Sequence, residues 1–378
     1  MDYTQIKGPA FVLDEQALEN NLSLIQKVRD QSGVQIILAL KGFAMWKVFP
    51  KVFQYLNGAT ASSLYEARLI FEEMGTKAHT YCVAYRPEEF EELCSYSSHM
   101  TFNSIKQFNR FIDQLKDNHP EISPGIRVNP EYSEVETELY NPAAPGSRLG
   151  EVIDNFGGNL PAGVEGLHFH TLCESSSYDL EKTLAVFETK FGKFFPFLKW
   201  VNFGGGHLMT RKGYDTEHLV NLLRAFKERY PHLEVILEPG SAIAWDTGPL
   251  VANVLDIHKS HGIQTLILDV SFTAHMPDTL EMPYRPKVRG AGDPVEGKPT
   301  YRLGGTSCLA GDYMFEYSFT NEVQVGDKII LEDMMHYTMV KTTMFNGVHH
   351  PDICIWTKEQ KLETVRKFSY EDYKNRLS

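Results

Sequence analysis

The sequence predicts an α/β fold, a (β/α)8 barrel of the TIM type with a second, mainly β C-terminal domain. Between residues 34 and 240, short apolar or β-branched runs alternate with segments of helical period. After Gly240 the long helical segments cease and strand-like stretches follow one another. The chain has 378 residues, 42% of them hydrophobic and 23% charged, which is enough for two domains, each with its own core.

Eight apolar runs predict the strands of the barrel. In chain order they are QIILALK, GATASS, HTYCVA, HMTFNS, GIRVNP, GLHFHT, WVNFGGG and EVILEPG. Segments of helical period follow most of them, several with Ser or Thr at the helix start. These segments are MWKVFPKVFQYL, SLYEARLIFEEM, PEEFEELCSY, SIKQFNRFIDQL, LEKTLAVFETKFGKFF and TEHLVNLLRAFKERY. The alternation is typical of parallel strands joined by helices, with an open doubly wound sheet as the alternative.

The remainder of the chain predicts the second domain. Its strand-like stretches are PLVANVLDIHK, QTLILDVSF, PTYRLGG and DKIILEDMMHYTMVKTTMF. The segment EMPYRPKVRGAGDPVEGKPT, rich in Pro, Gly and charge, predicts a solvated loop. The first segment, GPAFVLDEQALENN, predicts a strand and a helix that pack with the C-terminal domain. We therefore predict a barrel over residues 20–245 and a β-rich domain of residues 1–19 plus 246–378.

Composition restricts the class of function. The 37 Lys and Arg against 49 Asp and Glu give a formal charge of −12, which disfavours nucleic acid and favours cationic small molecules. The first residues show no signal peptide, and no apolar run approaches the length of a membrane span. The five cysteines are odd in number and lack zinc-site spacing, so we expect reduced thiols and a cytoplasmic location. They are Cys82, Cys94, Cys173, Cys308 and Cys354.

In such a barrel the chemistry lies at the carboxyl ends of the strands. The residues that close the predicted strands are Lys41, Ser63, Asn129, His170, Gly204 to Gly206 and Glu238. An unpaired lysine ammonium is costly to bury, so Lys41 either reaches solvent at the strand end or serves as a nucleophilic amine. The three glycines predict either a tight turn or a backbone cradle for a phosphate.

The other two polar strand ends also allow two interpretations. His168 and His170 lie on one face of their strand, either as core histidines or as the start of a metal site. A metal site needs further ligands. Apart from His207, just after the glycines, the other strand ends offer no histidine, so we expect no metal. Glu238 could cap a helix, pair with an arginine, or hold a proton on a heteroaromatic nitrogen. An amine, a phosphate cradle, an imidazole and such a carboxylate are together what pyridoxal 5'-phosphate requires.

Many short motifs, in the same order and over nearly the whole chain, resemble the fold type III pyridoxal phosphate decarboxylases. This family contains ornithine, diaminopimelate and arginine decarboxylases and is related to alanine racemase. The matching motifs are the Lys41 segment, GATASSLYEA, RVNP, SRLG, GLHFH, FGGG, EPG, GGTSCLAGD and VGDKIILEDMMHYTMVKTTMFNG. The resemblance implies pyridoxal phosphate as cofactor, bound by the barrel. It also implies a homodimer with shared active sites, in which the second domain contributes to the interface and to the sites.

The resemblance also implies roles for single residues. Lys41 corresponds to the lysine that forms the Schiff base, and His170 to the histidine that stacks on the ring. Glu238 corresponds to the partner of the pyridine nitrogen, and the phosphate ligands correspond to Gly205, Gly206 and Tyr337. Cys308 resembles the cysteine that enters the site from the second subunit and manages a proton after carbon dioxide leaves; otherwise it is a small buried apolar residue.

Departures from the family pattern narrow the range of possible substrates. They are Thr60 for an aspartate, Cys173 for a serine, Ser241 for an arginine, and Leu309 for an acidic residue. These changes argue against ornithine and diaminopimelate as the substrate. The strings HTLCES, FTAHMPDTLEMPYRP and GTSCLAGDYM are most similar to the subgroup of carboxynorspermidine and carboxyspermidine decarboxylases of bacterial polyamine synthesis.

This subgroup implies decarboxylation of a long cationic substrate to norspermidine or spermidine. Four residues are candidates to bind its distal amines: Glu174, His275, Asp278 and Asp312. Diaminopimelate or arginine decarboxylation, a non-catalytic pyridoxal phosphate protein and a metal-dependent hydrolase remain as alternatives.

Overall fold

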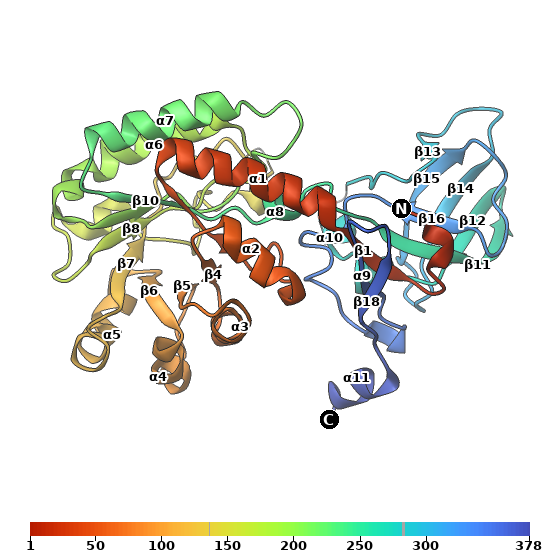
Figure 1. Cartoon of the computed structure of the whole chain (residues 1–378), viewed down its shortest axis with the longest axis horizontal. Coiled ribbons are helices and arrows are strands. Elements are labelled where there is room, and N and C mark those ends of the chain that lie inside the picture. Colours follow the sequence, from red (N-terminus) through yellow and green to blue (C-terminus); the bar gives the residue numbers. More distant parts are fainter. Residues whose placement is uncertain (136, 282–283) are drawn as a thin grey trace. The chain divides into compact units, whose positions relative to one another are not determined.

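The computed structural model describes residues 1–135, 137–281 and 284–378. It forms two compact units, one of Asn21–Ile243 and one of Met1–Asn20 with Ala244–Ser378 (Figure 1). Met282 and Pro283, which belong to the predicted solvated loop and to the motif FTAHMPDTLEMPYRP, lie outside the described residues.

The unit of residues 21–243 is a barrel of parallel strands. Its strands are β2 (Gln35–Ile36), β3 (Leu38–Ala39), β4 (Ala59–Ala61), β5 (Ala78–Cys82), β6 (Ser97–Phe102), β7 (Ser123–Arg127), β8 (Gly166–His168), β9 (Trp200–Asn202) and β10 (Glu234–Leu237). They are ordered β2-β10-β9-β8-β7-β6-β5-β4-β3. Only Ile37 separates β2 from β3, and its N–H donates to Leu237 O at 2.9 Å, while Leu38 N donates to Gly58 O at 3.0 Å. This segment therefore joins the first and last strands, so the predicted barrel is confirmed and the open sheet is wrong.

Helices lie around the outside of these strands (Figure 1). The helical segments with residues in this unit are α1 (Glu15–Ser32), η2 (Trp46–Val48), α2 (Phe49–Tyr55), α3 (Leu64–Met74), α4 (Pro87–Ser95), α5 (Ile105–Asn118), η3 (Glu138–Tyr140), η4 (Ile153–Phe156), α6 (Ser177–Phe191), η5 (Gly192–Phe197), α7 (Thr216–Arg229) and α8 (Ser241–Ala244). Serine hydroxyls cap several helix starts: Ser63 accepts from Glu66 N, and Ser176 forms a capping box with Asp179.

Trp200 fills the amino-terminal end of the barrel. Its ring lies where a Cβ on Gly125 or Gly166 would be, so β7 and β8 both need glycine at this level. The indole Nε1 donates to Ser123 Oγ at 2.8 Å, and this hydroxyl donates to Glu165 Oε2 at 2.6 Å. Because this end is filled, the open positions lie at the carboxyl ends of the strands.

The second unit contains a mixed sheet. Its strands are β1 (Ala10–Asp14), β11 (Leu250–Ser260), β12 (Ile263–Leu268), β13 (Ala291–Gly292), β14 (Thr300–Gly304), β15 (Tyr313–Phe319), β16 (Lys328–Leu331), β17 (Asp352–Trp356) and β18 (Leu362–Arg366). They are ordered β13-β15-β14-β12-β11-β1-β17-β18, with β16 also paired to β11. β1 lies antiparallel to β11 and parallel to β17. The helical segments are η1 (Tyr3–Gln5), α9 (Phe272–His275), α10 (Asp278–Glu281), η6 (Phe345–Gly347) and α11 (Tyr370–Asn375).

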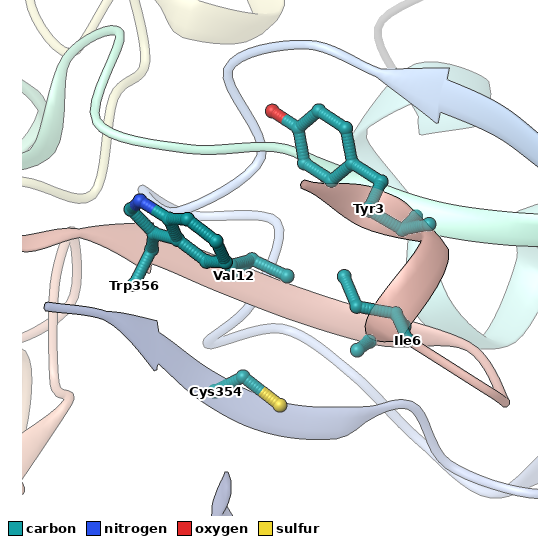
Figure 2. Close-up of a cluster of buried hydrophobic side chains, with 7 residues drawn as sticks. Tyr3, Ile6, Val12, Cys354 and Trp356 are labelled. Atoms are coloured by element: carbon teal, nitrogen blue, oxygen red, sulfur yellow. The ribbon is translucent and has the colours of Figure 1, made fainter. Parts of the chain in front are cut away.

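A cluster of apolar side chains stabilises this sheet. Figure 2 shows Trp356 and Cys354 on β17 close to Val12 on β1, with Tyr3 and Ile6 from the N-terminal segment. Each of these five residues is at most 9% exposed. Burial of this apolar surface holds the N-terminal segment on a sheet made mainly of C-terminal strands.

One predicted strand is wrong over most of its length. The stretch DKIILEDMMHYTMVKTTMF forms a strand only at Lys328–Leu331 and then continues in turns. Asp333 has φ 60° and Tyr337 has φ 44°, in the left-handed region that a strand does not contain. The Met334 N–H donates to Gly248 O at 2.8 Å. The apolar residues of this segment are thus buried by a folded loop.

Candidate active site

A cavity lies at the carboxyl ends of the barrel strands. Its lining side chains come from almost every strand end of the barrel, and most are polar. They are Ala39, Lys41, Thr60, Ser62, Tyr81, Arg127, His168, His170 and Glu238. The barrel therefore brings together three residues predicted from the strand ends, namely Lys41, His170 and Glu238.

Lys41 lies in the turn that follows β3. A Cβ on the next residue, Gly42, would lie 2.8 Å from Gly240 Cα, so the Lys41 turn and the loop after Glu238 touch backbone to backbone. The Lys41 side chain lines the cavity, and the residue is exposed to solvent there. Burial lowers the pKa of the Lys41 ammonium below its usual value, and the positive charge of Arg127 lowers it further.

His170 contacts Lys41 directly. The distance between Lys41 Nζ and His170 Nε2 is 3.1 Å, and the Gly205 N–H donates to His170 Nδ1 at 2.7 Å. The Arg127 guanidinium donates to the backbone carbonyl of His170 at 3.0 Å. Burial holds the pKa of the imidazole well below its ordinary value, with the charges of Lys41 and Arg127 acting in the same direction. His170 is therefore a neutral imidazole with both nitrogens in contact.

Glu238 follows β10 and is 8% exposed. Asn202 Nδ2 donates to its Oε1 at 2.7 Å, and His168 Nε2 lies 3.7 Å from its Oε2. Burial raises the pKa of Glu238, against the hydrogen bond from Asn202 and the positive charges of Lys41 and Arg127, which lower it. This carboxyl group is therefore suited to hold a proton shared with a basic partner in the cavity.

The three glycines after β9 allow close backbone approach. Gly204 and Gly206 have φ of 66° and 89°, in the left-handed region. A Cβ on Gly204 would lie 2.5 Å from Phe169 O, and a Cβ on Gly205 would lie 2.5 Å from Glu238 O. These contacts alone require glycine at these positions. Since the Gly205 N–H donates to His170, phosphate binding by Gly205 and Gly206 stays a prediction.

Arg127 is the main residue of the cavity that the sequence interpretation missed. It closes β7, is 4% exposed, and its guanidinium carbon lies 4.8 Å from the centre of the Tyr81 ring. Tyr81, in turn, donates from its hydroxyl to Asn103 Oδ1 at 2.7 Å. The available signal is the arginine inside the apolar run GIRVNP, whose pattern places the strand end at Asn129 instead.

The residues present fit pyridoxal phosphate. The cavity offers an amine, a neutral imidazole and a buried carboxyl group, each of which has a counterpart on this cofactor. In addition, the buried atoms Arg127 Nε, His168 Nδ1 and His168 Nε2 have no hydrogen-bond partner among the described residues. Buried polar atoms of this kind need a polar occupant of the cavity. Over the same part of the chain, no group of three or more His, Cys, Asp or Glu is placed to hold a metal ion.

Two predicted site residues of the second unit lie in its loops. Tyr337 is in the turn segment after β16. Cys308 is exposed, and its N–H donates to Asn346 Oδ1 at 2.7 Å, which fixes the loop around it. The roles of both residues stay predictions.

The candidate substrate-binding residues have different surroundings. Glu174 is an exposed residue in the loop after β8, with φ 48°. Asp278 pairs with Lys341 at 2.5 Å. His275 is fully buried, and its Nδ1 accepts from Ser271 N at 3.1 Å.

Asp312 is the candidate with the most local contacts. It is 5% exposed, and its carboxylate accepts from Ser307 Oγ at 2.6 Å, Ser307 N at 3.1 Å and Thr273 N at 3.1 Å. These bonds organise the loop that carries Cys308.

The barrel and its cavity define a class of pyridoxal phosphate enzymes built on a TIM-type barrel with a second sheet. A family model described as pyridoxal-dependent decarboxylase, C-terminal sheet domain, matches residues 11–335. The chain belongs to this family. The predicted pyridoxal phosphate-dependent decarboxylase and its cofactor are thereby confirmed.

Individual relatives cover nearly the whole chain. A carboxyaminopropylagmatine decarboxylase of Synechocystis is 50% identical over 99% of this chain and 96% of its own length. A carboxynorspermidine/carboxyspermidine decarboxylase of Campylobacter jejuni is 44% identical over 99% of both chains. The crystal structure of the Campylobacter jejuni carboxynorspermidine decarboxylase in complex with norspermidine has a TM-score of 0.90 at 42% identity, covering 98% of this chain and 100% of that one. Decarboxylation is the activity that these relatives share by name.

No helix in the described ranges 1–135, 137–281 and 284–378 is long and apolar enough to cross a membrane.

Proposed function

We propose that the protein decarboxylates carboxynorspermidine or carboxyspermidine at the α-carbon and releases carbon dioxide with norspermidine or spermidine. The observation that carries this proposal is the convergence of Lys41, His170 and Glu238 on one cavity. Relatives at 44% and 37% identity, each aligned over 99% of this chain, carry both substrates in their names.

Each barrel residue would hold a different part of the cofactor. Lys41 would bond to its aldehyde carbon, Glu238 would face its ring nitrogen, and His170 would cover its ring. Phosphate ligands would come from Gly205, Gly206 and Tyr337. When bound, pyridoxal phosphate supplies an electron sink for the electron pair left on the α-carbon as carbon dioxide departs.

Proton positions are the protein's contribution to the reaction. Glu238 would keep a proton on the ring nitrogen, because a buried carboxylate beside a nitrogen base favours the charged pair. Either Lys41 or Cys308 would return a proton to the α-carbon. Cys308 is exposed on its loop, where its N–H donates to Asn346 Oδ1, so its thiol is open to solvent.

Acidic side chains would hold the distal amines of the substrate. Of the four candidates, Glu174 is exposed and belongs to the same unit as the cavity. Asp278 and Asp312 already have partners in their own unit, namely Lys341 and the pair Ser307 and Thr273. These contacts make Glu174 the first residue to test.

Carboxyaminopropylagmatine is a second candidate substrate. The relative named for it is 50% identical to this chain, a higher identity than the 44% of the Campylobacter jejuni protein. An agmatine end presents a planar guanidinium in place of an ammonium, and this group forms paired hydrogen bonds with a carboxylate. The two proposals therefore differ only at the far end of the substrate.

Substrate kinetics distinguish the candidates. We expect carbon dioxide release from carboxynorspermidine or carboxyspermidine with the highest kcat/KM, and a lower value for carboxyaminopropylagmatine. A higher value for carboxyaminopropylagmatine would replace the first proposal by the second. Preference for diaminopimelate or arginine would overturn both. Glu174→Gln should raise KM for the preferred substrate more than it lowers kcat.

We also propose a homodimer located in the cytoplasm, with residues 1–19 and 246–378 contributing to the interface. Support comes from large apolar side chains exposed near Cys308: Leu309 at 46%, Tyr313 at 47% and Phe315 at 40%. Mixing Lys41→Ala with Cys308→Ala protein should restore part of the activity through hybrid dimers. Failure to do so, with subunit exchange demonstrated, would contradict a shared site.

A further inference from the structure

Two hydrogen bonds made by His170 determine where its protons are. The Gly205 backbone N–H lies 2.7 Å from His170 Nδ1, and a backbone amide can only donate. Nδ1 must therefore be the unprotonated nitrogen. A neutral imidazole carries one proton, so that proton is on Nε2.

The contact with Lys41 then has a defined direction. His170 Nε2 lies 3.1 Å from Lys41 Nζ, and a protonated Nε2 can only donate in this contact. An ammonium has no lone pair to accept with, whereas an uncharged amine has one. We propose that the Gly205 amide fixes His170 as the Nε2-protonated tautomer, and that this tautomer holds Lys41 as an uncharged amine in the cofactor-free protein.

The charged groups around Lys41 are consistent with this assignment. Burial and the positive charge of Arg127 lower the pKa of Lys41, while Glu238, Cys173 and Glu66 act in the opposite direction. Burial is the largest of these effects. Burial also raises the pKa of Glu238, Cys173 and Glu66. These three groups are therefore less readily ionised than free side chains, and they place less negative charge beside Lys41.

The consequence concerns loading of the cofactor and holds for every candidate substrate. An uncharged amine adds directly to the aldehyde carbon: the nitrogen bonds to that carbon, and the aldehyde oxygen leaves as water with the two hydrogens of the amine. No proton has to be removed from Lys41 beforehand. Gly205 and His170 are thus positioning residues for this amine, and Gly205 has a role that its predicted phosphate contact does not include.

Nitrogen NMR of the cofactor-free protein tests the tautomer. In protein labelled with ¹⁵N at histidine, and with the His170 signals assigned from the His170→Asn variant, we expect a protonated Nε2 and an unprotonated Nδ1 near neutral pH. The opposite tautomer, or a doubly protonated ring, would overturn the proposal. This measurement needs neither cofactor nor substrate, so it is independent of the proposed function.

Competitive labelling with acetic anhydride tests the charge of Lys41. The pH midpoint of labelling, measured by mass spectrometry in the cofactor-free protein, should be lower for Lys41 than for the exposed Lys212 in the same sample. An equal or higher midpoint would overturn the proposal. The midpoint is compared, not the rate, because the rate also depends on how easily the reagent reaches each lysine.

Variants link the two halves of the proposal. Asn at position 170 can still accept from Gly205 but does not reach Lys41, so His170→Asn should raise the labelling midpoint of Lys41 by about one pH unit, the size of one lost hydrogen bond. His207→Asn is the matched control, because His207 is also buried and its Nε2 lies 3.1 Å from Gly204 O. An equal shift in both variants would mean general loosening of the site and would contradict the specific role of His170.

Discussion

The barrel cavity and the apolar cluster of the second unit bury opposite kinds of side chain. Around its cavity the barrel buries Arg127, His168 and Glu238, together with the neutral His170. The apolar cluster of the second unit, with Val12 and Trp356 at its centre, contains no charged group. Burying titratable groups disfavours their charged forms, whereas burying apolar groups stabilises the fold. The buried titratable groups of the barrel cavity therefore lower the stability of the fold, whereas the apolar cluster raises it.

Lys41→Ala is the strongest way to test this contrast. We expect decarboxylation to fall on the order of 10⁴-fold, because no other amine contacts His170 in this cavity among the described residues. Stability should change little, since the Lys41 residue is exposed to solvent. Carbon dioxide release measures the activity, and urea unfolding measures the stability. Borohydride reduction followed by mass spectrometry detects covalently attached cofactor. Lys212→Ala is the control, and full activity of Lys41→Ala would exclude the assigned site.

Trp356→Ala should have the reverse pattern. Truncating this side chain, which is 6% exposed, should lower the free energy of unfolding by about 3–5 kcal/mol. The barrel cavity contains no residue of this cluster, so cofactor attachment to the folded protein should be unchanged. Urea unfolding and absorbance of bound cofactor check both. Phe197→Ala, at a position 73% exposed, is the control and should have little effect on stability.

Glu238→Gln should affect both activity and pH dependence. In the proposed function Glu238 faces the ring nitrogen, so loss of its charge should lower kcat by about 10²–10³-fold. Burial raises the pKa of Glu238 above its value in the unfolded chain. The stability contributed by this group is thus present below the unfolded pKa and is lost as pH rises through the folded pKa.

Glutamine does not titrate, so the stability of wild type relative to Glu238→Gln should decrease over that pH range. Urea unfolding of the cofactor-free proteins at a series of pH values measures this difference. The exposed Glu174 gives the control variant Glu174→Gln. A difference that does not change with pH would contradict the raised pKa.

Gly166→Ala should have the smallest effect. The new methyl group would overlap the Trp200 ring, and we expect a loss of about 1–3 kcal/mol in the free energy of unfolding. Gly192→Ala is the matched control, because a Cβ there meets nothing within 4 Å. That variant should be neutral or more stable by about 0.4–1 kcal/mol. Equal values for the two variants would show that Trp200 does not fill the barrel end tightly.

The barrel could be predicted because its signals are local. Each strand is a short apolar run, and the position of Lys41, His170 and Glu238 at strand ends follows from the known location of chemistry in this fold. Arg127 was missed because a buried cation inside an apolar run has no periodic signal, and its partners Tyr81 and His170 are distant in sequence.

The second unit was harder to predict for a different reason. The residues after Leu331 are apolar and β-branched like a strand, but Asp333 and Tyr337 take left-handed backbone conformations. Tertiary contacts such as Met334 N–H to Gly248 O decide that conformation. Strand β17, which the apolar pattern does not mark, pairs with β1 at the other end of the chain. Strands β15 and β18 are also unmarked, although they pair with the neighbouring strands β14 and β17.

The closure of the barrel at Ile37 also bears on how the chain folds. The bond from Ile37 N–H to Leu237 O joins segments that are translated far apart in time, and contacts of such long sequence separation form late and slowly. The turn that carries Lys41 lies against Gly240, just beyond β10. A nascent chain should therefore be unable to capture its cofactor until β10, the last strand of the barrel, has docked, which makes cofactor binding a sign that the barrel has closed.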